Sequence, residues 1–321
     1  MSGGVVGSAF AALLDSGPWA IDGGLASELE AQGHDLTGAL WSARLLRDDP
    51  RALVDVHRAY AQAGAVVAIS ASYQASREGF AAAGLDAAEA DVLLARSVAL
   101  AREASDEAAG LRGGRPLLVA ASVGPYGAIR HDGSEYRGRY GLSHGELVAF
   151  HRERLDVLVA AGPDLLALET VPDLEEVEAL VEVLADHPDV PAWLSLSCAD
   201  GEHVHAGQTV RETAAVAASA PSVLAVGVNC TPPEHVEGVL ASLAVGVAEA
   251  GRPGLALLAY PNAGRTWDAA AECWRGEGAT TLPDDVVAGW VGAGARLVGG
   301  CCGLGPDAVR AVATTTARLR G

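Results

Sequence analysis

The chain has 321 residues, of which 50% are hydrophobic, and a formal net charge of −19 at pH 7. This length permits one large barrel domain with a sizeable core. The acidic balance argues against nucleic-acid binding, which needs a basic surface. No stretch reaches the roughly 18 apolar residues of a membrane span. The first residues also lack the basic start and long apolar run of a secretory signal. We therefore expect the reducing cytoplasm, where cysteine thiols stay free to bind metal.

Eight short apolar runs follow one another along the chain, separated by amphipathic stretches. Near-continuous apolar runs of this length are typical of parallel strands that are buried on both faces. The predicted strands are residues 19–24, 66–72, 117–124, 165–170, 191–198, 223–230, 255–261 and 295–300.

The stretches between these runs carry recognisable helix signals. Asp49 and Pro50 predict a helix start, and Gly64 predicts its end. Capping-box spacing, which marks further helix starts, occurs four times: Asp86 with Glu89, Ser143 with Glu146, Asp173 with Glu176, and Thr209 with Glu212.

Eight strands alternating with helices predict a (β/α)8 TIM barrel, formed by residues 1–321 as a single domain. A doubly wound open sheet is the alternative, although no Gly-x-Gly-x-x-Gly follows the first run. In a barrel the functional site lies at the carboxyl ends of the strands. The longest polar connection, residues 125–142, would lie on that face, and long polar loops in compact domains are usually functional or mobile.

The last apolar run ends in Gly299-Gly300-Cys301-Cys302-Gly303. Neighbouring side chains of a strand point to opposite faces, so two consecutive cysteines share a target only where the chain leaves strand geometry. The three glycines permit this. Thiolates suit zinc, and a catalytic zinc needs three protein ligands and an open position. Cys230, at the end of another run, is the best third ligand, and Cys198 is its rival. A buried pair of cysteines, a vicinal disulfide or a redox pair are the alternatives.

The sequence Gly227-Val228-Asn229-Cys230, followed by the Gly-Gly-Cys-Cys-Gly stretch, resembles the homocysteine S-methyltransferase family. The resemblance extends from about Ala20 to the last helix. Weaker matching stretches are Asp22-Gly23-Gly24, Ser70-Ala71-Ser72-Tyr73-Gln74, Ser122-Val123-Gly124-Pro125-Tyr126-Gly127 and Leu168-Glu169-Thr170.

This resemblance implies one zinc ion per chain, held by Cys230, Cys301 and Cys302, and L-homocysteine as the methyl acceptor. Asp22 and Glu169 are similar to the family's pair of carboxylates for the homocysteine amino group. The alternatives are a loop cap for Asp22 and a helix N-terminal charge for Glu169. The remaining expected substrate-site residues are Ser72 at a strand end, Asn229, which would orient the substrate or a metal ligand, and Tyr73, which would lie near zinc or line the pocket.

The stretch from Gly133 to Gly138 is similar to the branch of the family that uses a sulfonium donor, S-methylmethionine or S-adenosylmethionine. Tyrosine faces and carboxylates stabilise such cations, and Tyr126, Glu135 and Tyr136 are the expected donor contacts. Arg139 departs from the Asp or Asn of that branch, which leaves the donor open. A betaine-type methyltransferase and a non-enzymatic zinc or thiol-redox protein are the competing functions.

Three further residues have no assigned role in this scheme. Cys273, in the stretch 269–274, is expected in a packed helix or loop. His203 and His205 are expected in a solvated polar loop or, alternatively, in a minor surface metal site.

Overall fold

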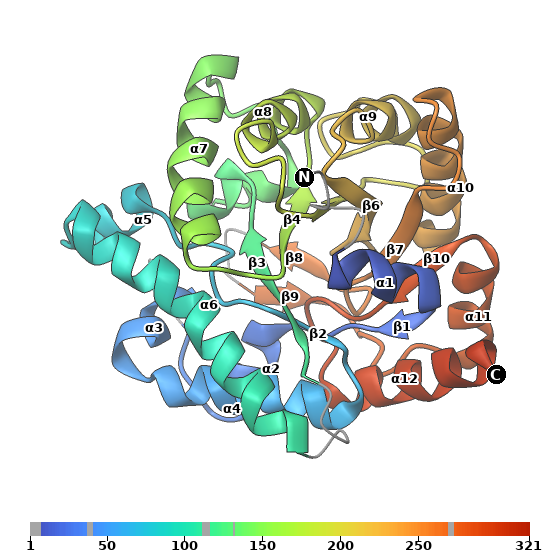
Figure 1. The fold of residues 1–321 in the computed structure, drawn as a ribbon, viewed down its shortest axis with the longest axis horizontal. Helices are drawn as coiled ribbons and strands as arrows, with labels where there is room; N and C mark the ends of the chain where they lie inside the picture. The colour runs from blue at the N-terminus through green and yellow to red at the C-terminus, as the bar shows by residue number, and fades with distance from the viewer. Residues whose placement is uncertain (1–7, 37–40, 111–115, 131, 269–272) are drawn as a thin grey trace.

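The structure, a computed structural model, describes residues 8–36, 41–110, 116–130, 132–268 and 273–321. Eight parallel strands form one sheet in the order β1-β10-β7-β6-β5-β4-β3-β2 (Figure 1). The two ends of this order meet where the Val66 N–H donates to the Ala20 carbonyl at 2.9 Å. The predicted TIM barrel is thus confirmed over the open sheet. The strands are β1 (Trp19–Ala20), β2 (Val67–Ile69), β3 (Leu118–Val123), β4 (Leu165–Val171), β5 (Ala192–Leu196), β6 (Val223–Asn229), β7 (Ala256–Tyr260) and β10 (Ala295–Val298).

Helices surround the strands and begin largely where the capping signals predict. Asp49 caps one helix whose end is Gly64, in the left-handed conformation with φ 110°. Complete capping boxes form at Asp86 and Ser143. The helices are α1 (Ala9–Ser16), α2 (Leu25–Ala31), α3 (Leu45–Asp48), α4 (Pro50–Ala63), α5 (Arg77–Ala82), α6 (Ala87–Ala109), α7 (His144–Ala160), α8 (Leu174–Leu184), α9 (Val210–Ala217), α10 (Pro233–Glu249), α11 (Asp284–Gly292) and α12 (Pro306–Arg320), with 3-10 turns η1 (Trp41–Arg44), η3 (Tyr126–Ile129) and η4 (Ser134–Tyr136).

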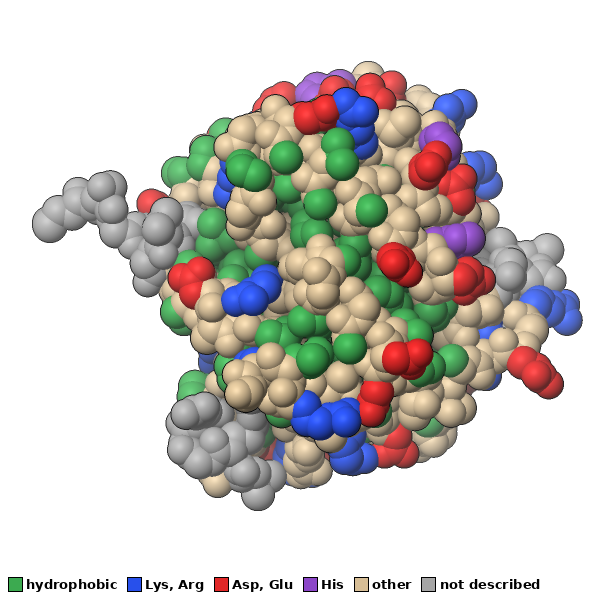
Figure 2. Space-filling model, turned by 90° about the vertical axis from the view of Figure 1, so that its right-hand side faces the viewer, with side chains coloured by type: hydrophobic (Ala, Val, Ile, Leu, Met, Phe, Trp, Pro, Cys, Tyr) green, Lys and Arg blue, Asp and Glu red, His purple; other side chains and the backbone are tan. Residues whose placement is uncertain are grey.

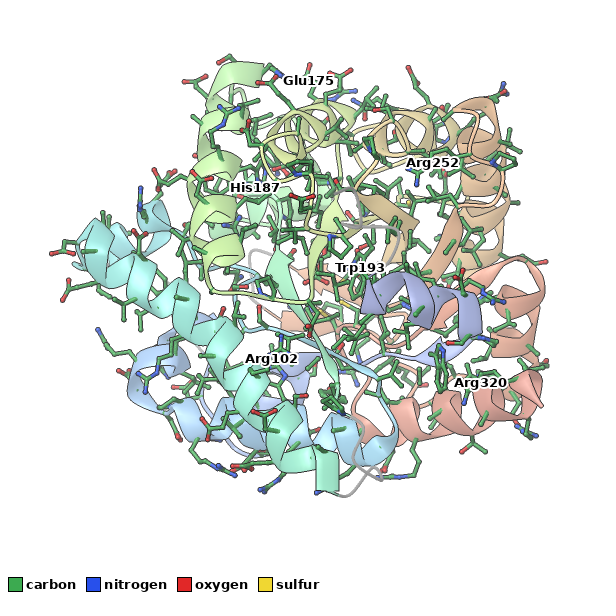
Figure 3. All side chains as sticks on the ribbon, viewed as in Figure 1. Arg102, Glu175, His187, Trp193, Arg252 and Arg320 are labelled. Atoms are coloured by element: carbon green, nitrogen blue, oxygen red, sulfur yellow. The ribbon has the colours of Figure 1, made fainter. Side chains whose placement is uncertain are left out.

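The interior of the barrel is filled by large side chains. Trp193 of β5 is fully buried within the ring of strands (Figure 3), and its ring centroid lies 6.0 Å from that of Phe10. Phe10 and Leu14 of helix α1 belong to this interior cluster. The N-terminal helix therefore packs against the side chains that fill the barrel. The barrel interior is thus filled beneath the carboxyl ends of the strands.

A two-stranded sheet outside the barrel was not predicted. Strands β8 (Thr266–Asp268) and β9 (Cys273–Arg275) form an antiparallel pair in which Trp267 lies opposite Trp274. The expectation of a helix or loop at Cys273 was wrong, because alternating polar and aromatic residues on both strands suit a hairpin. Residues 269–272 of the predicted stretch lie outside the described residues.

The molecular surface carries both signs of charge. On the face drawn in Figure 2, basic side chains alternate with acidic ones. Within the described ranges, no helix combines the length and apolar character that a bilayer crossing requires.

Candidate active site

Three cysteines converge at the carboxyl ends of two strands. Cys230 directly follows β6, and Cys301 and Cys302 follow β10. The Sγ atoms of Cys230 and Cys302 lie 3.5 Å apart, those of Cys301 and Cys302 lie 4.0 Å apart, and all three lie within 4.8 Å of one another. The three cysteines are free thiols. Three sulfurs at this spacing could hold one metal ion, as predicted.

The backbone conformation of Cys230 places its side chain beside the other two cysteines. Its φ of 47° lies in the left-handed region, which is uncommon for a residue other than glycine. Two hydrogen bonds hold it there: its N–H donates to the Tyr260 carbonyl at 3.2 Å, and its carbonyl accepts from Asn262 Nδ2 at 3.1 Å. Backbone strain of this kind persists where the surroundings enforce it and clusters at functional sites.

The glycines around the cysteine pair act differently from the expectation. Gly303 is left-handed with φ 82°, but Gly299 and Gly300 are not. A Cβ atom on Gly299 would lie only 2.6 Å from the Asp22 carbonyl oxygen, and the Gly300 N–H donates to that oxygen at 3.0 Å. Gly299 therefore permits the close approach of the chain that follows β1, whereas a Cβ atom on Gly300 would lie 2.6 Å from Leu304 Cβ. Neither glycine makes an unusual turn. The hydrogen bond from Gly300 brings Asp22 beside the cysteine pair.

Cys198, the rival ligand, lies outside this group of three. It is fully buried, and burial raises the pKa of its thiol. Its N–H donates to Thr231 Oγ1 at 2.9 Å. Cys198 is therefore a packed residue of the β5 end.

The three clustered thiols favour a negative charge on one of them. Hydrogen bonds from the thiols of Cys301 and Cys302 lower the pKa of Cys230 well below its ordinary value. The same interaction raises the pKa of Cys301 and Cys302. A cation would remove this competition, and a set of three thiols fits a soft ion that keeps one position open.

Two buried carboxyl groups lie at the carboxyl ends of β1 and β4, on the same face of the barrel as the cysteines. Glu169 of β4 accepts hydrogen bonds from Ser122 Oγ and, at 3.1 Å, from the Tyr260 hydroxyl. Burial raises the pKa of Glu169 to about 7. Asp22 accepts the Ile69 N–H at 2.7 Å through Oδ2, so it does cap a strand end. Its Oδ1 is buried without a hydrogen-bond partner among the described residues.

Burial, with the nearby Glu169 charge as a smaller cause, raises the pKa of Asp22 well above its ordinary value. Burial and mutual repulsion disfavour the ionised form of these two carboxyl groups. A cation bound between them would favour the ionised form of both. Ser122 and Tyr260, which hold Glu169, were missed from the sequence. Tyr260 closes the seventh apolar run, and this strand-end position was the signal that could have identified it.

The polar side-chain atoms of Asn229 and Ser72 form hydrogen bonds to other residues of the protein. Asn229 Oδ1 accepts from the Thr170 N–H at 2.7 Å and the Ser195 hydroxyl at 2.9 Å, and its Nδ2 donates to Thr170 Oγ1 at 2.7 Å. Thr170 follows Glu169 and has φ 62°, which is unusual for a β-branched residue. Ser72 donates to the Ser122 carbonyl at 2.7 Å. Asn229 therefore supports the β4 end that carries Glu169, and Ser72 supports Ser122, whose hydroxyl donates to Glu169.

The tyrosine hydroxyl in direct contact with a cysteine belongs to Tyr136, while Tyr73 is also close enough for the Cys230 charge to add to the rise that burial causes in its pKa. The Tyr136 hydroxyl lies 3.1 Å from Cys230 Sγ, and the Tyr136 ring meets the His205 ring edge-on at 5.8 Å. Tyr73 is buried nearby, and burial raises the pKa of its hydroxyl well above the usual value, with Glu135 contributing. The expectation that His205 is solvated is wrong, because it is half-buried against Tyr136.

The other predicted donor contacts lie in the same connection. Glu135 Oε2 is buried without a partner among the described residues, and burial raises the pKa of Glu135 to about 7. The Tyr126 hydroxyl donates to Glu78 at 3.2 Å, and its ring packs edge-on against Phe150 at 5.0 Å. Glu135 and Tyr136 thus face the cysteine side, whereas Tyr126 packs into the base of the connection.

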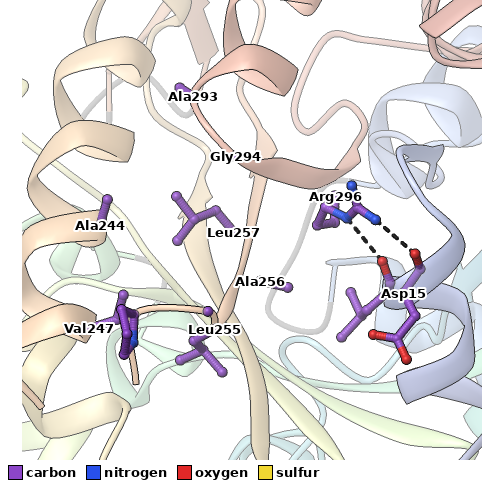
Figure 4. Close-up of a pocket in the computed structure, with 12 residues that line it drawn as sticks. Asp15, Ala244, Val247, Leu255, Ala256, Leu257, Ala293, Gly294 and Arg296 are labelled. Atoms are coloured by element: carbon purple, nitrogen blue, oxygen red, sulfur yellow. Dashed lines mark hydrogen bonds between the residues drawn. The ribbon is translucent and has the colours of Figure 1, made fainter. Parts of the chain in front are cut away.

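A cavity at the opposite end of the barrel is separate from this site (Figure 4). It is lined by residues at the amino ends of β7 and β10, including Leu255, Ala256 and Gly294. Arg296 donates there to the Leu14 and Asp15 carbonyls at 3.0 and 2.9 Å. Because the cysteines follow the carboxyl ends of strands, this cavity does not belong to the candidate active site.

The fold and the site together define a TIM-barrel enzyme with three thiols that could hold a metal ion. The profile of the family described as "Homocysteine S-methyltransferase" matches residues 20–316. The chain belongs to the homocysteine S-methyltransferase family.

Individual relatives agree with this assignment. The chain is 45% identical to homocysteine S-methyltransferase of Escherichia coli, covering 91% of this chain and 93% of the relative. It is also 45% identical to homocysteine S-methyltransferase 4 of Zea mays, covering 91% of this chain and 87% of the relative. The crystal structure of the E. coli homocysteine methyltransferase MmuM in its metallated form superposes with a TM-score of 0.83 at 42% identity, covering 94% of this chain and 98% of that one.

Proposed function

We propose that this enzyme transfers a methyl group from a sulfonium donor, preferably S-methylmethionine, to L-homocysteine and forms methionine in a zinc-dependent reaction. S-adenosylmethionine is the second candidate donor. The observation that carries the proposal is the group of three sulfurs within 4.8 Å, beside the buried Asp22 and Glu169. We also infer that residues 1–321 act as one barrel domain in the cytoplasm, where a thiol group of this kind stays reduced.

Cys230, Cys301 and Cys302 would hold the zinc ion. Bound zinc would supply a deprotonated, nucleophilic substrate sulfur at neutral pH, where a free thiol is mostly protonated. The protein's own contribution is the fixed backbone at Cys230 and the close approach of β1 to β10, which keep the three thiols together without the substrate. Among the residues that the structure describes, no fourth sulfur joins the three thiols, and this arrangement favours an enzyme over a structural metal site.

Asp22 and Glu169 would bind the homocysteine ammonium group. Both lie at strand ends next to the cysteines, and Asp22 Oδ1 is a buried acceptor without a partner among the described residues. An ammonium group donates up to three hydrogen bonds and would favour the ionised form of both carboxyls. Asn229 and Ser72 would position the Glu169 carboxyl through Thr170 and Ser122.

Glu135 and Tyr136 would face the donor. S-methylmethionine carries an ammonium group as well as its sulfonium, and Glu135 Oε2 is a buried acceptor free to receive it. The only cation of betaine is a quaternary ammonium group without an N–H, so Glu135 would have no donor to accept from. An unsatisfied buried acceptor costs about 1–3 kcal/mol, which is roughly tenfold or more in discrimination. The carboxylate of the donor has weaker support, because Arg130 and Arg137 lie near Asp132 and Arg139 donates to the Ala206 carbonyl.

The purified enzyme tests the proposal directly when homocysteine is offered with each donor in turn at equal concentration. We expect methionine to form fastest from S-methylmethionine. Faster methylation from betaine would overturn the donor assignment. No methionine from any donor, with thiol oxidation as the only chemistry, would favour the thiol-redox alternative instead.

A further inference from the structure

We propose that Glu176 is a positioning residue that fixes both ends of the connection between β3 and α7 and so holds Glu135 and Tyr136 beside Cys230. This connection comprises residues 125–142 and is described except for residue 131. Glu176 lies in the first turn of α8 and is fully buried. It has no direct role in the chemistry proposed above.

Three polar groups converge on the Glu176 carboxylate. The Tyr126 N–H donates to Oε1 at 2.6 Å, and the Tyr140 hydroxyl donates to Oε2 at 2.9 Å. His151 Nε2 lies 2.9 Å from Oε1. Tyr126 and Tyr140 stand at the two ends of the connection. A single buried carboxylate therefore closes it into a loop.

The chain between Tyr126 and Tyr140 is tightly packed, so the position of these two residues fixes the position of the turn between them. A Cβ atom on Gly127 would lie 2.4 Å from the Glu135 backbone nitrogen, so η3 and η4 are in direct backbone contact. Ser134 Oγ donates to the Gly127 carbonyl at 3.4 Å. Movement of Tyr126 or Tyr140 would therefore displace the turn that carries Glu135 and Tyr136.

The start of α8 also holds residues 125–142 through a second side chain, that of Asp173. Asp173, the N-cap residue, accepts the Arg139 N–H at 2.8 Å. The spacing of Asp173 and Glu176 predicted an ordinary capping box, but the Glu176 side chain turns inward to the connection instead. Helix α8 follows β4 directly, so the strand that carries Glu169 also leads into the helix that carries Glu176.

A buried cation offsets the charge of Glu176 without help from a substrate. Arg154 of α7 is buried and donates to the Gly124 carbonyl at 2.9 Å and to the Tyr73 carbonyl at 3.1 Å. Its attraction to Glu176 partly counters the effect of burial on the pKa of Arg154. The carboxylate can therefore accept several hydrogen bonds at once, which the amide of glutamine cannot, because its NH2 group would face donors.

The test compares Glu176→Gln with Glu175→Gln, a matched control at the adjacent, exposed position (Figure 3). Because the inference rests on the proposed function, kinetics with sulfonium donor and homocysteine are combined with trypsin cleavage of the substrate-free protein. For Glu176→Gln we expect kcat/KM for the donor to fall about tenfold and the homocysteine KM to stay within about twofold. Cleavage after Arg130, Arg137 or Arg139 should become faster. Glu175→Gln should match the wild type in both measurements.

The outcomes separate this inference from the proposed function. If the wild type is inactive with every sulfonium donor, the proposed function is refuted. Trypsin cleavage of the substrate-free proteins then still tests whether Glu176 holds the connection in place. Equal changes in both KM values, or unchanged cleavage in Glu176→Gln, would refute the positioning role. If Glu176→Gln does not fold, Tyr140→Phe removes one of the hydrogen bonds, and its donor-selective loss of about two- to tenfold decides the question. Its absence would refute the role.

Discussion

The hydroxyl oxygen of Tyr136 lies 3.1 Å from the sulfur of Cys230, although the two residues are 94 positions apart in the chain. This contact joins the connection between β3 and α7 to the three thiols that could hold a metal ion. A methyl transfer needs the donor carbon aligned with the acceptor sulfur, and a group held at this point is suited to align them.

Replacing Tyr136 by Phe tests whether that hydroxyl serves the donor. We expect kcat/KM for the sulfonium donor to fall about two- to tenfold, the range of one neutral hydrogen bond, with zinc content unchanged. Steady-state kinetics with varied donor measure this effect. Wild-type kinetics from both Tyr136→Phe and Glu135→Gln would mean that the connection merely covers the site.

Glu169→Gln and Asp22→Asn test recognition of the homocysteine amino group. Each removes a charge-assisted hydrogen bond, so we expect the KM for homocysteine to rise about tenfold or more with a smaller change in kcat. The exposed Glu175→Gln serves as the control for loss of one negative charge. A normal homocysteine KM in both site variants would exclude these carboxyls from substrate binding.

The raised pKa of Glu169 predicts a pH-dependent stability. Its pKa is about 7 in the folded protein against an ordinary value of 4.5, so the folded state binds the proton more tightly. The stability contributed by this proton is complete below pH 4.5 and is lost as the pH rises to about 7. The free energy of unfolding of the substrate-free wild type, relative to Glu169→Gln, should therefore fall by about 3 kcal/mol across this window. Denaturant titrations at several pH values measure it, and parallel pH profiles for the two proteins would refute the assignment.

Asn229→Ala tests the support behind Glu169. The substitution leaves the buried Thr170 N–H without its partner and removes the donor to the Thr170 hydroxyl, and an unsatisfied buried group costs about 1–3 kcal/mol. We expect a lower free energy of unfolding by at least this amount, measured by denaturant titration, and a raised homocysteine KM because Glu169 loses its anchor. Unchanged stability would show that the left-handed Thr170 is held by other contacts.

Much of the fold and the metal site could be predicted from the sequence because their signals are local. Every predicted apolar run overlaps a strand of the barrel, and the strand ends fix where Cys230, Cys301 and Cys302 meet. The barrel also places Asp22 and Glu169 on the same face. Periodicity and strand-end position carry this information without knowledge of any side-chain contact.

The contacts between distant side chains could not be predicted in the same way. Glu176 has capping-box spacing, yet burial against α7 directs its carboxylate to Tyr126 and Tyr140. Gly299 resembles a turn residue, yet its role is the approach of the chain that follows β1. Which of Tyr73 and Tyr136 reaches Cys230 depends on the path of the long connection. Such details follow from packing between elements, which a single sequence does not encode locally.

The zinc content of the purified wild type and of its Cys301→Ala variant tests the central claim most directly. Elemental analysis should find about one zinc ion per chain in the wild type and almost none in the variant, because two thiols cannot supply the three ligands of a catalytic site. Cys198→Ala, which alters a thiol outside the group of three, should retain its zinc. Full zinc occupancy in Cys301→Ala would contradict the assignment of Cys230, Cys301 and Cys302 as the metal ligands.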